Sequence, residues 1–344
     1  MKKDLAFGEK VIFMPDATRG AVRYLTTKQV EETGTNNIVV NTLHLMISPG
    51  AQKIQALGGI KKFMNFNGTV LSDSGGFQVF SLLHTKKWKG KITNEGAIFK
   101  SPKDGNTFEL TPEKSIEIQM MLDSDVMVVL DDCRNAEISR EQAEISVERT
   151  IEWAKRAKKH FEKLDGKKKG KLLSCVVQGA NFLDLREICS KELSKLNFDG
   201  YNFGGYVADD NGDLVLDEMK TVIENTPKDK FKYAMGVGKP EDIIVASKLG
   251  YTIFDTVLPS RNARHGTVYS FDEKGYILRI TSAPYSEDLR PIDSTCDCYT
   301  CKNHTRAYVH HLIRNDESTG KQLATIHNLR FYQRLVEKIN NKET

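Results

Sequence analysis

Short apolar runs that end in polar or glycine residues recur along the chain, and there are eight of them. They occupy residues 11–14, 38–40, 70–71, 126–130, 172–177, 201–203, 233–235 and 252–254. Apolarity within each run is continuous rather than alternating, which is typical of strands buried on both faces of a parallel sheet. The pattern therefore predicts eight parallel strands, each leading into a polar or glycine-containing turn.

Helical patterns lie between several of these runs. Thr111 and Pro112 predict a helix start with proline at the first helical position. Residues 139–142 resemble a capping box, and apolar residues follow at helical spacing, namely Val147, Ile151, Ala154, Ala157 and Phe161. Another helix is expected from Pro240. Strands alternating with helices predict an α/β fold, a (β/α)8 TIM barrel whose polar strand ends meet at one face. A doubly wound sheet is the alternative, but no glycine-rich phosphate motif follows the first run.

Two interruptions are expected to be peripheral. Residues 97–101 and 107–110 predict an inserted hairpin with its turn at 102–105, near an Asp-Gly pair. The basic run 167–171 leads into a strand, so in a barrel it lies on the face opposite the polar strand ends. We therefore interpret it as a solvated loop rather than as an RNA-binding segment.

Composition and charge limit the class of protein. The chain has 344 residues, of which 39% are hydrophobic and 28% charged, with a formal net charge of +4. These values are ordinary for a globular enzyme, and the mild basic excess permits a polyanionic partner without requiring one. No apolar run resembles a signal peptide or a membrane span. Three of the 6 cysteines cluster at 296–301, which favours a cytoplasmic protein without a disulfide framework.

Carboxylates follow three of the predicted strands. Asp73, Asp131 and Asp255 would face one barrel mouth, where their mutual repulsion costs stability unless function uses it. Carboxylate pairs in one cleft carry out glycosidic-bond chemistry, in which one attacks the anomeric carbon and the other handles the leaving group's proton. A glycosidase on a TIM barrel is therefore one reading. Phe77 and Met235 could sandwich a base, although ordinary core packing explains such residues equally well.

A pair of arginines and a cysteine cluster add two further signals. Arg261 and Arg264 follow Asp255 closely and suit a negatively charged substrate, the alternative being a solvated arginine pair. The C-x-C-x-x-C pattern of Cys296, Cys298 and Cys301, with His327 downstream, predicts a closed structural zinc site. Free thiols or an iron–sulfur cluster are the alternatives, and the competing imidazoles are those of His304, His310 and His311.

Several motifs together resemble one family. They are DSGGFQ from residue 73, VVLDDC from 128, VVQGA from 176, NFGGY from 202, MGVG from 235, FDTVLPSRNARHG from 254, and CDCYTC from 296 with a later His-Asn pair. Their order and sequence resemble the bacterial-type tRNA-guanine transglycosylases (queuine tRNA-ribosyltransferases), across nearly the whole chain. The resemblance implies a TIM barrel at 1–285 and, at 286–344, a zinc-binding subdomain with the C-terminal helix that completes the barrel.

The resemblance also implies roles for individual residues. Asp255 would attack the ribose of the wobble guanosine to form a covalent intermediate, and Asp73 would act as general acid and base. Asp131, Gln178 and the backbone of Gly205 would recognise the base, and Phe77 and Met235 would stack on it. Ser74 and Asn41 would support Asp73, while Arg261 and Arg264 would hold phosphates. Zinc would be the only cofactor.

The partners implied are tRNAs with G-U-N anticodons (Asp, Asn, His and Tyr), a 7-substituted deazaguanine and a second copy of the chain. The loop Tyr206, Ala208 and Asp209 departs from the usual bacterial sequence. We expect Asp209 to accept hydrogen bonds from the diol of queuine, against the smaller 7-aminomethyl-7-deazaguanine precursor. Tyr308, His310 and His311 are expected at a homodimer interface. A non-catalytic tRNA-binding subunit is the rival function, which the presence of both Asp73 and Asp255 disfavours.

Overall fold

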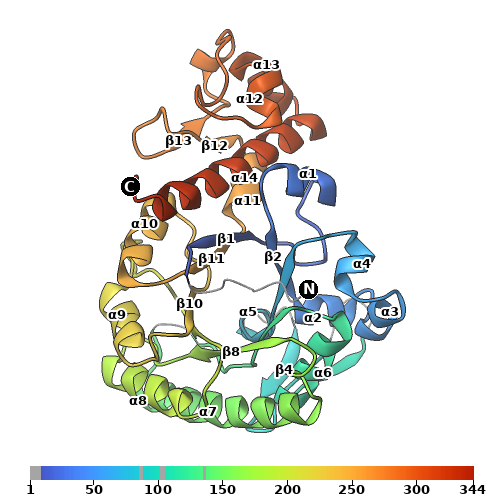
Figure 1. Cartoon of the computed structure of the whole chain (residues 1–344), viewed down its shortest axis with the longest axis vertical. Coiled ribbons are helices and arrows are strands. Elements are labelled where there is room, and N and C mark those ends of the chain that lie inside the picture. The colour runs from blue at the N-terminus through green and yellow to red at the C-terminus, as the bar shows by residue number, and fades with distance from the viewer. Residues whose placement is uncertain (1–8, 85–87, 101–104, 135–136) are drawn as a thin grey trace.

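A closed barrel of eight parallel strands forms the centre of the molecule (Figure 1). The computed structural model describes residues 9–84, 88–100, 105–134 and 137–344. The sheet runs in the order β1-β11-β10-β9-β8-β7-β3-β2, with β1 Ile12–Pro15, β2 Asn37–Asn41, β3 Thr69–Asp73, β7 Val126–Val128, β8 Leu172–Val177, β9 Gly200–Phe203, β10 Phe231–Ala234 and β11 Ile253–Thr256. A parallel bridge between Asp16 and Val39 joins β1 to β2 and closes the sheet. The predicted (β/α)8 barrel is confirmed.

Helices connect the strands and cover the outside of the barrel (Figure 1). They are α1 Thr27–Glu32, α2 Thr42–Ile47, α3 Ala51–Ala56, α4 Ile60–Met64, α5 Gly76–His84, α6 Pro112–Leu122, α7 Arg140–Lys163, α8 Leu183–Ser194, α9 Leu216–Glu224, α10 Pro240–Leu249 and α14 Ser318–Asn340. The Thr111 and Ser139 side chains cap α6 and α7 as predicted, each accepting a backbone N–H. The predicted apolar side of α7 is buried. Among the described residues, every helix is too short or too polar to cross a membrane.

The two predicted interruptions lie at different ends of the barrel. Arg149 hydrogen-bonds both Asn94 of the hairpin insertion and Asp132, next to the cavity residue Asp131, whereas the basic run lies at the opposite end. The hairpin consists of β5 Ala97–Lys100 and β6 Thr107–Leu110, and β4 Lys89–Ile92 adds a third antiparallel strand. Residues 101–104 of the predicted hairpin fall outside the described residues. The basic run precedes β8 at the opposite end of the barrel, where Lys168 lies 2.6 Å from Asp165 and Lys171 pairs with Asp123. These local ion pairs are consistent with a solvated loop.

A small subdomain is inserted between the last barrel strand and the last helix, and forms the top of Figure 1. It contains α11 Leu258–Arg264, β12 Thr267–Tyr269, β13 Ile277–Arg279, the 3-10 helix Ala283–Tyr285, α12 Tyr299–Asn303 and α13 Arg306–Arg314. One apolar cluster contains Val268 and Leu278 from the hairpin, Val309 and Ile313 from α13, and Ala324 from α14. This cluster contains residues from both sides of position 285. The domain boundary predicted there stays a prediction.

Candidate active site and metal site

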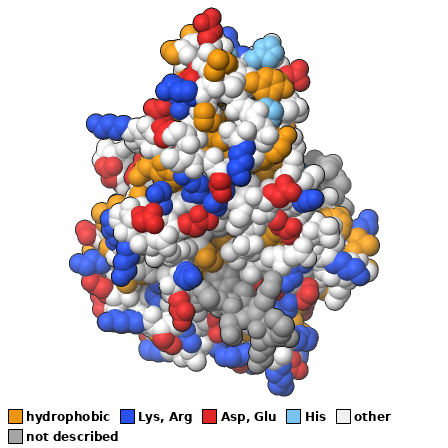
Figure 2. All heavy atoms as spheres, turned by 45° about the horizontal axis from the view of Figure 1, so that its top comes forward, with side chains coloured by type: hydrophobic (Ala, Val, Ile, Leu, Met, Phe, Trp, Pro, Cys, Tyr) orange, Lys and Arg blue, Asp and Glu red, His pale blue; other side chains and the backbone are white. Residues whose placement is uncertain are grey.

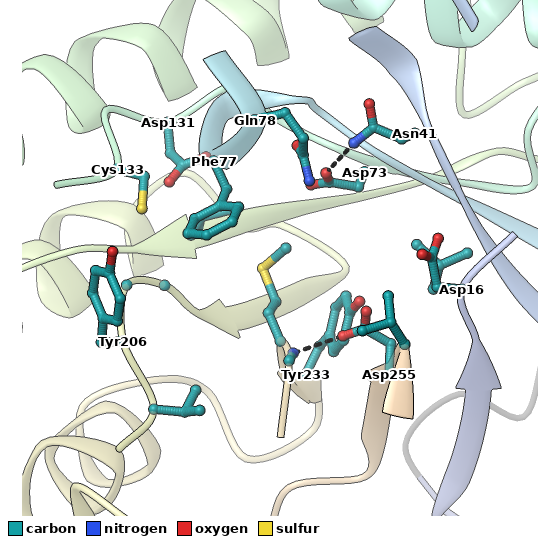
Figure 3. A pocket seen from close by; sticks show the side chains of 18 of the residues that line it. Asp16, Asn41, Asp73, Phe77, Gln78, Asp131, Cys133, Tyr206, Tyr233 and Asp255 are labelled. Carbon is teal, nitrogen blue, oxygen red and sulfur yellow. Dashed lines mark hydrogen bonds between the residues drawn. The ribbon is translucent and has the colours of Figure 1, made fainter. Parts of the chain in front are cut away.

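The mouth of the barrel contains a cavity of about 330 Å³, shown in Figure 3. Residues from all eight barrel strands or the turns after them line it. They include Asp16, Asn41, Asp73, Phe77, Gln78, Asp131, Cys133, Gly204, Gly205, Tyr206, Tyr233, Met235, Gly236 and Asp255. The sequence analysis predicted the convergence of Asp73, Asp131 and Asp255, and the structure brings these three carboxylates to one cavity.

The alternation of side chains along a strand explains why polar residues meet here. The barrel interior is filled by an apolar layer that includes Met14, Val39, Leu71, Val176 and Ile253. Side chains two positions further along a strand point to the same side, one layer nearer the mouth. Those positions hold Asp16, Asn41, Asp73, Gln178 and Asp255. The cavity floor is therefore a polar layer stacked directly on the barrel core.

Asp73 lies at the end of β3 and is the carboxylate with the most strongly raised pKa of the three. Asn41 Nδ2 donates to its Oδ2 at 2.8 Å, and the backbone N–H of Gly75 also donates to it. Burial, followed by the charges of Asp131 and Asp255, raises the pKa of Asp73 to about 7. At neutral pH this group can therefore either hold or release a proton, as a general acid and base must.

Asp255 lies at the end of β11, where two neutral donors contact it. The backbone N–H of Gly236 donates to its Oδ1 at 2.7 Å, and the Tyr233 hydroxyl forms a second hydrogen bond. Burial raises the pKa of Asp255 to about 6, although both hydrogen bonds oppose this shift. Two donors to the carboxylate favour its ionised form, which suits Asp255 to be the nucleophile of the pair.

Asp131 follows β7 and is oriented by residues behind the cavity wall. Gln178 Nε2 donates to its Oδ2 at 2.6 Å, and the Ser74 hydroxyl forms another hydrogen bond. Burial raises the pKa of Asp131 to about 6. The adjacent Asp132 has a different role, because it forms ion pairs with Arg134 at 2.8 Å and with Arg149. Asp131 thus keeps an acceptor edge for a ligand, whereas Asp132 is tied into the fold.

The walls of the cavity consist of apolar side chains and of the backbone of two glycines. Phe77 remains 47% exposed although it is a large apolar residue, and Met235 lines the same cavity. Gly204 and Gly205 form part of the wall after β9. A Cβ on Gly204 would come within 2.6 Å of Gln178 Nε2, so a side chain there would disturb the group that orients Asp131. The arrangement suits a planar heterocycle with hydrogen-bond donors along one edge.

The loop after β9 differs from its predicted role. Asp209 turns away from the cavity, because its Oδ1 accepts the backbone N–H groups of Asn211 and Asp213, both at 2.9 Å. These hydrogen bonds, that of Asp213 first, hold the pKa of Asp209 below its ordinary value. Ala208 forms a bridge with Leu214 and does not line the cavity either. The expected contact between Asp209 and a diol is therefore not supported by this geometry.

Three arginines form a basic cluster on the subdomain side of the cavity. Arg261 and Arg264 lie in the last turn of α11, which follows directly after β11. Burial lowers the pKa of Arg264, and the charges of Arg23 and Arg261 lower it further. Within the described part of the chain, none of the three forms an ion pair with a carboxylate. Figure 2 shows basic and acidic side chains mixed over the face that it draws. A cluster of arginines without counter-charges suits phosphates.

Sequence reasoning missed Asp16, Tyr233, Arg23 and Arg186. Asp16 follows Pro15 and occupies the same layer as Asp73 and Asp255, so the two-residue spacing could have identified it. Arg186 gives no such signal, since a helix arginine ordinarily faces solvent. Here it is 1% exposed, lies over the Phe203 ring, and donates to the carbonyls of Val177, Ala180 and Gly204. It thereby joins the two turns that carry Gln178 and Gly205.

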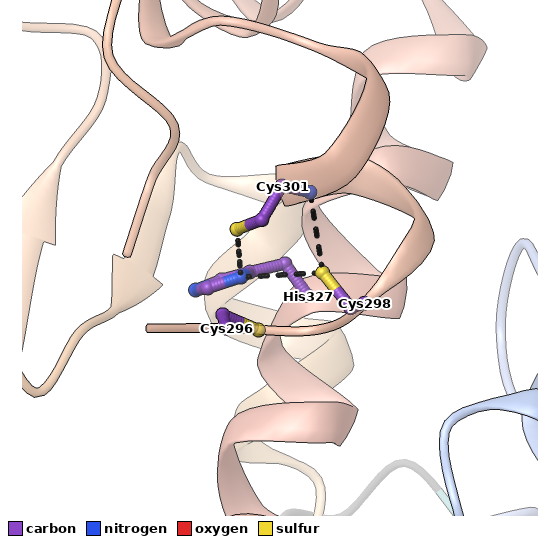
Figure 4. Close-up of side chains that lie close together, drawn as sticks. All are labelled: Cys296, Cys298, Cys301 and His327. Carbon is purple, nitrogen blue, oxygen red and sulfur yellow. Dashed lines mark hydrogen bonds between the residues drawn. The ribbon is translucent and has the colours of Figure 1, made fainter. Parts of the chain in front are cut away.

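The predicted metal ligands form a compact group in the subdomain (Figure 4). The ligand atoms of Cys296, Cys298, Cys301 and His327 all lie within 4.8 Å of one another. His327 Nδ1 lies 3.6 Å from Cys298 Sγ and 3.2 Å from Cys301 Sγ. Four tetrahedral ligands placed about 2.0–2.3 Å from zinc would be spaced on the order of 3.5 Å apart, so the group fits this ion.

The orientation of His327 supports the same conclusion. Its Nε2 contacts the backbone carbonyl of Tyr269, an arrangement in which Nε2–H donates and Nδ1 keeps its lone pair for a metal. The competing His310 instead contacts the carbonyl of Ile280 at 2.8 Å, and His304 stacks on Tyr308. All six cysteines are free of disulfides, as predicted. The Cys3His group could therefore hold a metal ion.

Comparison with known proteins agrees with the motif resemblance. A family model described as "Queuine tRNA-ribosyltransferase" matches residues 8–342. Proteins of that name from Vibrio cholerae serotype O1 (strain M66-2) and Tolumonas auensis (strain DSM 9187 / NBRC 110442 / TA 4) are 42% and 40% identical to it. The first alignment covers 95% of this chain and 84% of the relative, the second 97% and 87%. A third relative, from Blochmanniella floridana, is 43% identical over 96% of this chain and 85% of its own length. The chain therefore belongs to the queuine tRNA-ribosyltransferase family.

Proposed function

We propose that this enzyme exchanges the wobble guanine of tRNAs with G-U-N anticodons, those for Asp, Asn, His and Tyr, for a 7-substituted deazaguanine. Queuine tRNA-ribosyltransferase activity is the activity of its family. The observation that carries the finer proposal is the convergence of Asp73, Asp131 and Asp255 in one cavity, each with different hydrogen-bond partners. These three environments suit three separate tasks on one nucleotide.

In the proposed reaction Asp255 attacks C1′ of the ribose while the bond from C1′ to guanine N9 breaks. Asp73 gives its proton to the departing guanine, which leaves a ribosyl ester on Asp255. The incoming base then loses its N9 proton to Asp73 and attacks C1′, which releases the Asp255 carboxylate. The raised pKa of Asp73, about 7, suits the group that must carry and release a proton near neutral pH, and Asp255 lies just before α11, which carries Arg261 and Arg264.

Base recognition is assigned to Asp131, Gln178 and the backbone of Gly205. An ionised carboxylate accepts two N–H groups, and guanine-like bases present such donors at N1 and at the exocyclic amine. Phe77 and Met235 would contact the two faces of the base. Ser74 and Asn41 position Asp131 and Asp73 respectively, and both hydrogen bonds are present before any substrate binds. Because Ser74 hydrogen-bonds Asp131, we assign it to Asp131 and not to Asp73.

The remaining proposals concern the rest of the tRNA and the assembly. Arg261 and Arg264 would hold phosphates beside the reacting nucleotide. Zinc held by the Cys3His group would stabilise the subdomain, in which a bound metal contributes to folding free energy. Tyr299 and Tyr308 are exposed on that subdomain, which supports a homodimer built there. His310 would contribute less than predicted, because one ring nitrogen is already occupied by Ile280.

The proposal is tested by incubating the full chain with tRNA carrying labelled guanine at the wobble position. Loss of label on addition of queuine or 7-aminomethyl-7-deazaguanine would support it, and kcat/KM for each base would identify the preferred one. Asp255→Asn should abolish the covalent tRNA adduct seen on a denaturing gel. An adduct that survives in Asp255→Asn and disappears in Asp73→Asn would reverse the two roles. Binding without exchange would favour a non-catalytic subunit, and release of guanine without replacement would favour a glycosidase.

A further inference from the structure

Asp16 is a fourth carboxylate in the cavity, and the proposed reaction leaves it without a task. It directly follows β1, the strand that pairs with β11 so that Met14 lies opposite Asp255. Asp16 is two positions beyond Met14, so its side chain points to the same side of the strand as that of Met14, and it lines the same cavity as Asp255. Its charge raises the pKa of both Asp255 and Asp73. This repulsion acts against ionisation of the nucleophile, so the carboxylate is a cost unless a ligand uses it.

The hydrogen bonds of Asp16 leave it able to accept more. The Thr18 hydroxyl lies 2.7 Å from both of its oxygens, and the backbone N–H of Thr18 also donates to it. Burial raises the pKa of Asp16; in its ionised form a carboxylate has about four acceptor positions, so Asp16 can accept further hydrogen bonds. Within the described ranges, no lysine or arginine forms an ion pair with Asp16. Such a group can bind only a hydrogen-bond donor, and it repels phosphate.

The position of Asp16 identifies which part of a bound nucleotide it would meet. Figure 3 shows Asp131, Cys133 and Tyr206 at one end of the cavity and Asp16 at the other, on the side of Asp255. If the base lies against Asp131, the sugar carrying C1′ lies over Asp255, and Asp16 faces the sugar. Within an RNA chain the 3′ and 5′ oxygens of that sugar are esterified. The 2′-hydroxyl is then the only hydrogen-bond donor that the ribose retains.

We propose that Asp16 accepts a hydrogen bond from the 2′-hydroxyl of the reacting nucleotide and so selects ribonucleotides over deoxyribonucleotides. The 2′-hydroxyl is the group by which proteins distinguish RNA from DNA. It is attached to the carbon next to C1′, so a carboxylate beside the nucleophile is within its reach. Hydrogen bonds to this hydroxyl strengthen as positive charge develops at C1′. Asp16 is thus a specificity-determining residue for the proposed exchange, and the inference rests on that proposed function.

The test compares two anticodon-arm RNA hairpins that differ only at the exchanged guanosine, which is either the ribonucleotide or its 2′-deoxy form. Exchange of labelled guanine is measured as kcat/KM for the wild-type chain, Asp16→Ala and Asp16→Asn. A hydrogen bond to a charged acceptor corresponds to roughly tenfold to hundredfold discrimination. Asp16→Ala should therefore reduce the ribose preference at least about tenfold. Asp16→Asn, which keeps the shape and one weaker acceptor, should fall between wild type and alanine.

Asp199→Asn is the matched control, because Asp199 accepts a backbone hydrogen bond from Leu173 at the far end of the barrel. It should leave the ribose preference unchanged. Equal loss of exchange on both hairpins in the Asp16 variants would overturn the inference, since the role of Asp16 would then be in folding or general electrostatics. An unchanged preference would overturn it as well. A wild-type chain that exchanges guanine in neither hairpin would overturn the proposed function itself, and this inference with it.

Discussion

The hydroxyl of Tyr233 offers a sharp test of how the nucleophile is tuned. Tyr233 is 1% exposed, and its hydroxyl is hydrogen-bonded to Asp255. Burial, with the charge of Asp255, raises the pKa of Tyr233 well above its ordinary value, so the hydroxyl stays a donor. A donor to the ionised carboxylate lowers the carboxyl pKa. Tyr233→Phe keeps the ring in place and removes this donor alone, so it should raise the pKa of Asp255.

The size of the change follows from the strength of the hydrogen bond. A bond to a charged group contributes about 1.5–3 kcal/mol, and 1.36 kcal/mol corresponds to about one pKa unit. The Gly236 N–H remains at 2.7 Å, so we expect the lower end, a rise of about one unit. The pKa of Asp255 would then move from about 6 to roughly 7. At pH 6 the ionised fraction would fall roughly fivefold, whereas above pH 8 it would barely change.

The assay is kcat/KM for guanine exchange into tRNA, measured across pH for wild type and Tyr233→Phe. The ratio of the two profiles removes the contribution of Asp73, which both proteins share. Tyr251→Phe is the control, because the Tyr251 hydroxyl is equally buried but donates to the carbonyl of Met219, at 3.0 Å. An acid limb that stays in place or moves to lower pH would refute the assignment of Asp255 as the ionised nucleophile. So would an equal shift in Tyr251→Phe.

Three further predictions concern the metal, the arginines and the stability of the fold. The purified chain should contain about one zinc ion. Cys298→Ala should lose the zinc and tRNA affinity but retain the circular dichroism spectrum of the barrel. A His327→Ala variant that is still fully loaded with metal would exclude His327 as a ligand. Arg261→Ala and Arg264→Ala should each weaken tRNA binding and reduce the slope of log K against log salt by roughly 0.7–0.9; an unchanged slope would contradict a phosphate contact. The pKa of Asp73 rises from 3.8 to about 7 on folding, so the folded protein holds this proton more tightly than the unfolded chain. The free energy of unfolding of wild type therefore falls as pH rises from about 4 to 7. At pH 8 the free energy of unfolding of Asp73→Asn should therefore exceed that of wild type by about 1–3 kcal/mol, with a higher unfolding temperature. At pH 4 the two proteins should unfold at nearly the same temperature.

The barrel could be predicted from the sequence because its strands differ plainly from its helices. Runs such as 38–40 and 172–177 are largely apolar, as burial on both faces requires, and each ends where the chain turns polar. The cysteine spacing, with His327 downstream, likewise predicted the Cys3His group that could hold a metal ion, because three thiolates and an imidazole form a tetrahedral ligand set. In both cases a local pattern of residue types is closely tied to one structure.

Other features depend on contacts that no local pattern records. Asp209 seemed suited to a ligand by its position after Gly204 and Gly205, but its own loop supplies the donors that occupy it. Arg186 is buried because three carbonyls from two turns happen to face it. Asp16 falls between these cases. The two-residue spacing that placed Asp255 in the layer applies to it equally, but Pro15 and Ala17 disguise the end of the first strand.

The partners of the cavity carboxylates explain how four acidic groups can line one cavity with pKa values raised above the ordinary one. A cation beside a carboxylate typically lowers its pKa by one to three units, which would leave Asp73 unable to hold a proton for the leaving base. The cavity instead uses neutral donors for its acids, and the ion pairs of Asp132 show that guanidinium groups were available one residue away. The neutral donors belong to Asn41, Gln178, Tyr233, Gly236 and Thr18. Positive charge is placed instead at α11, where Arg261 and Arg264 can meet phosphate without lowering the pKa values on which proton transfer depends. In the proposed mechanism, the separation of neutral donors in the cavity from guanidiniums outside it would therefore allow one site to bind a polyanion and still protonate its leaving group.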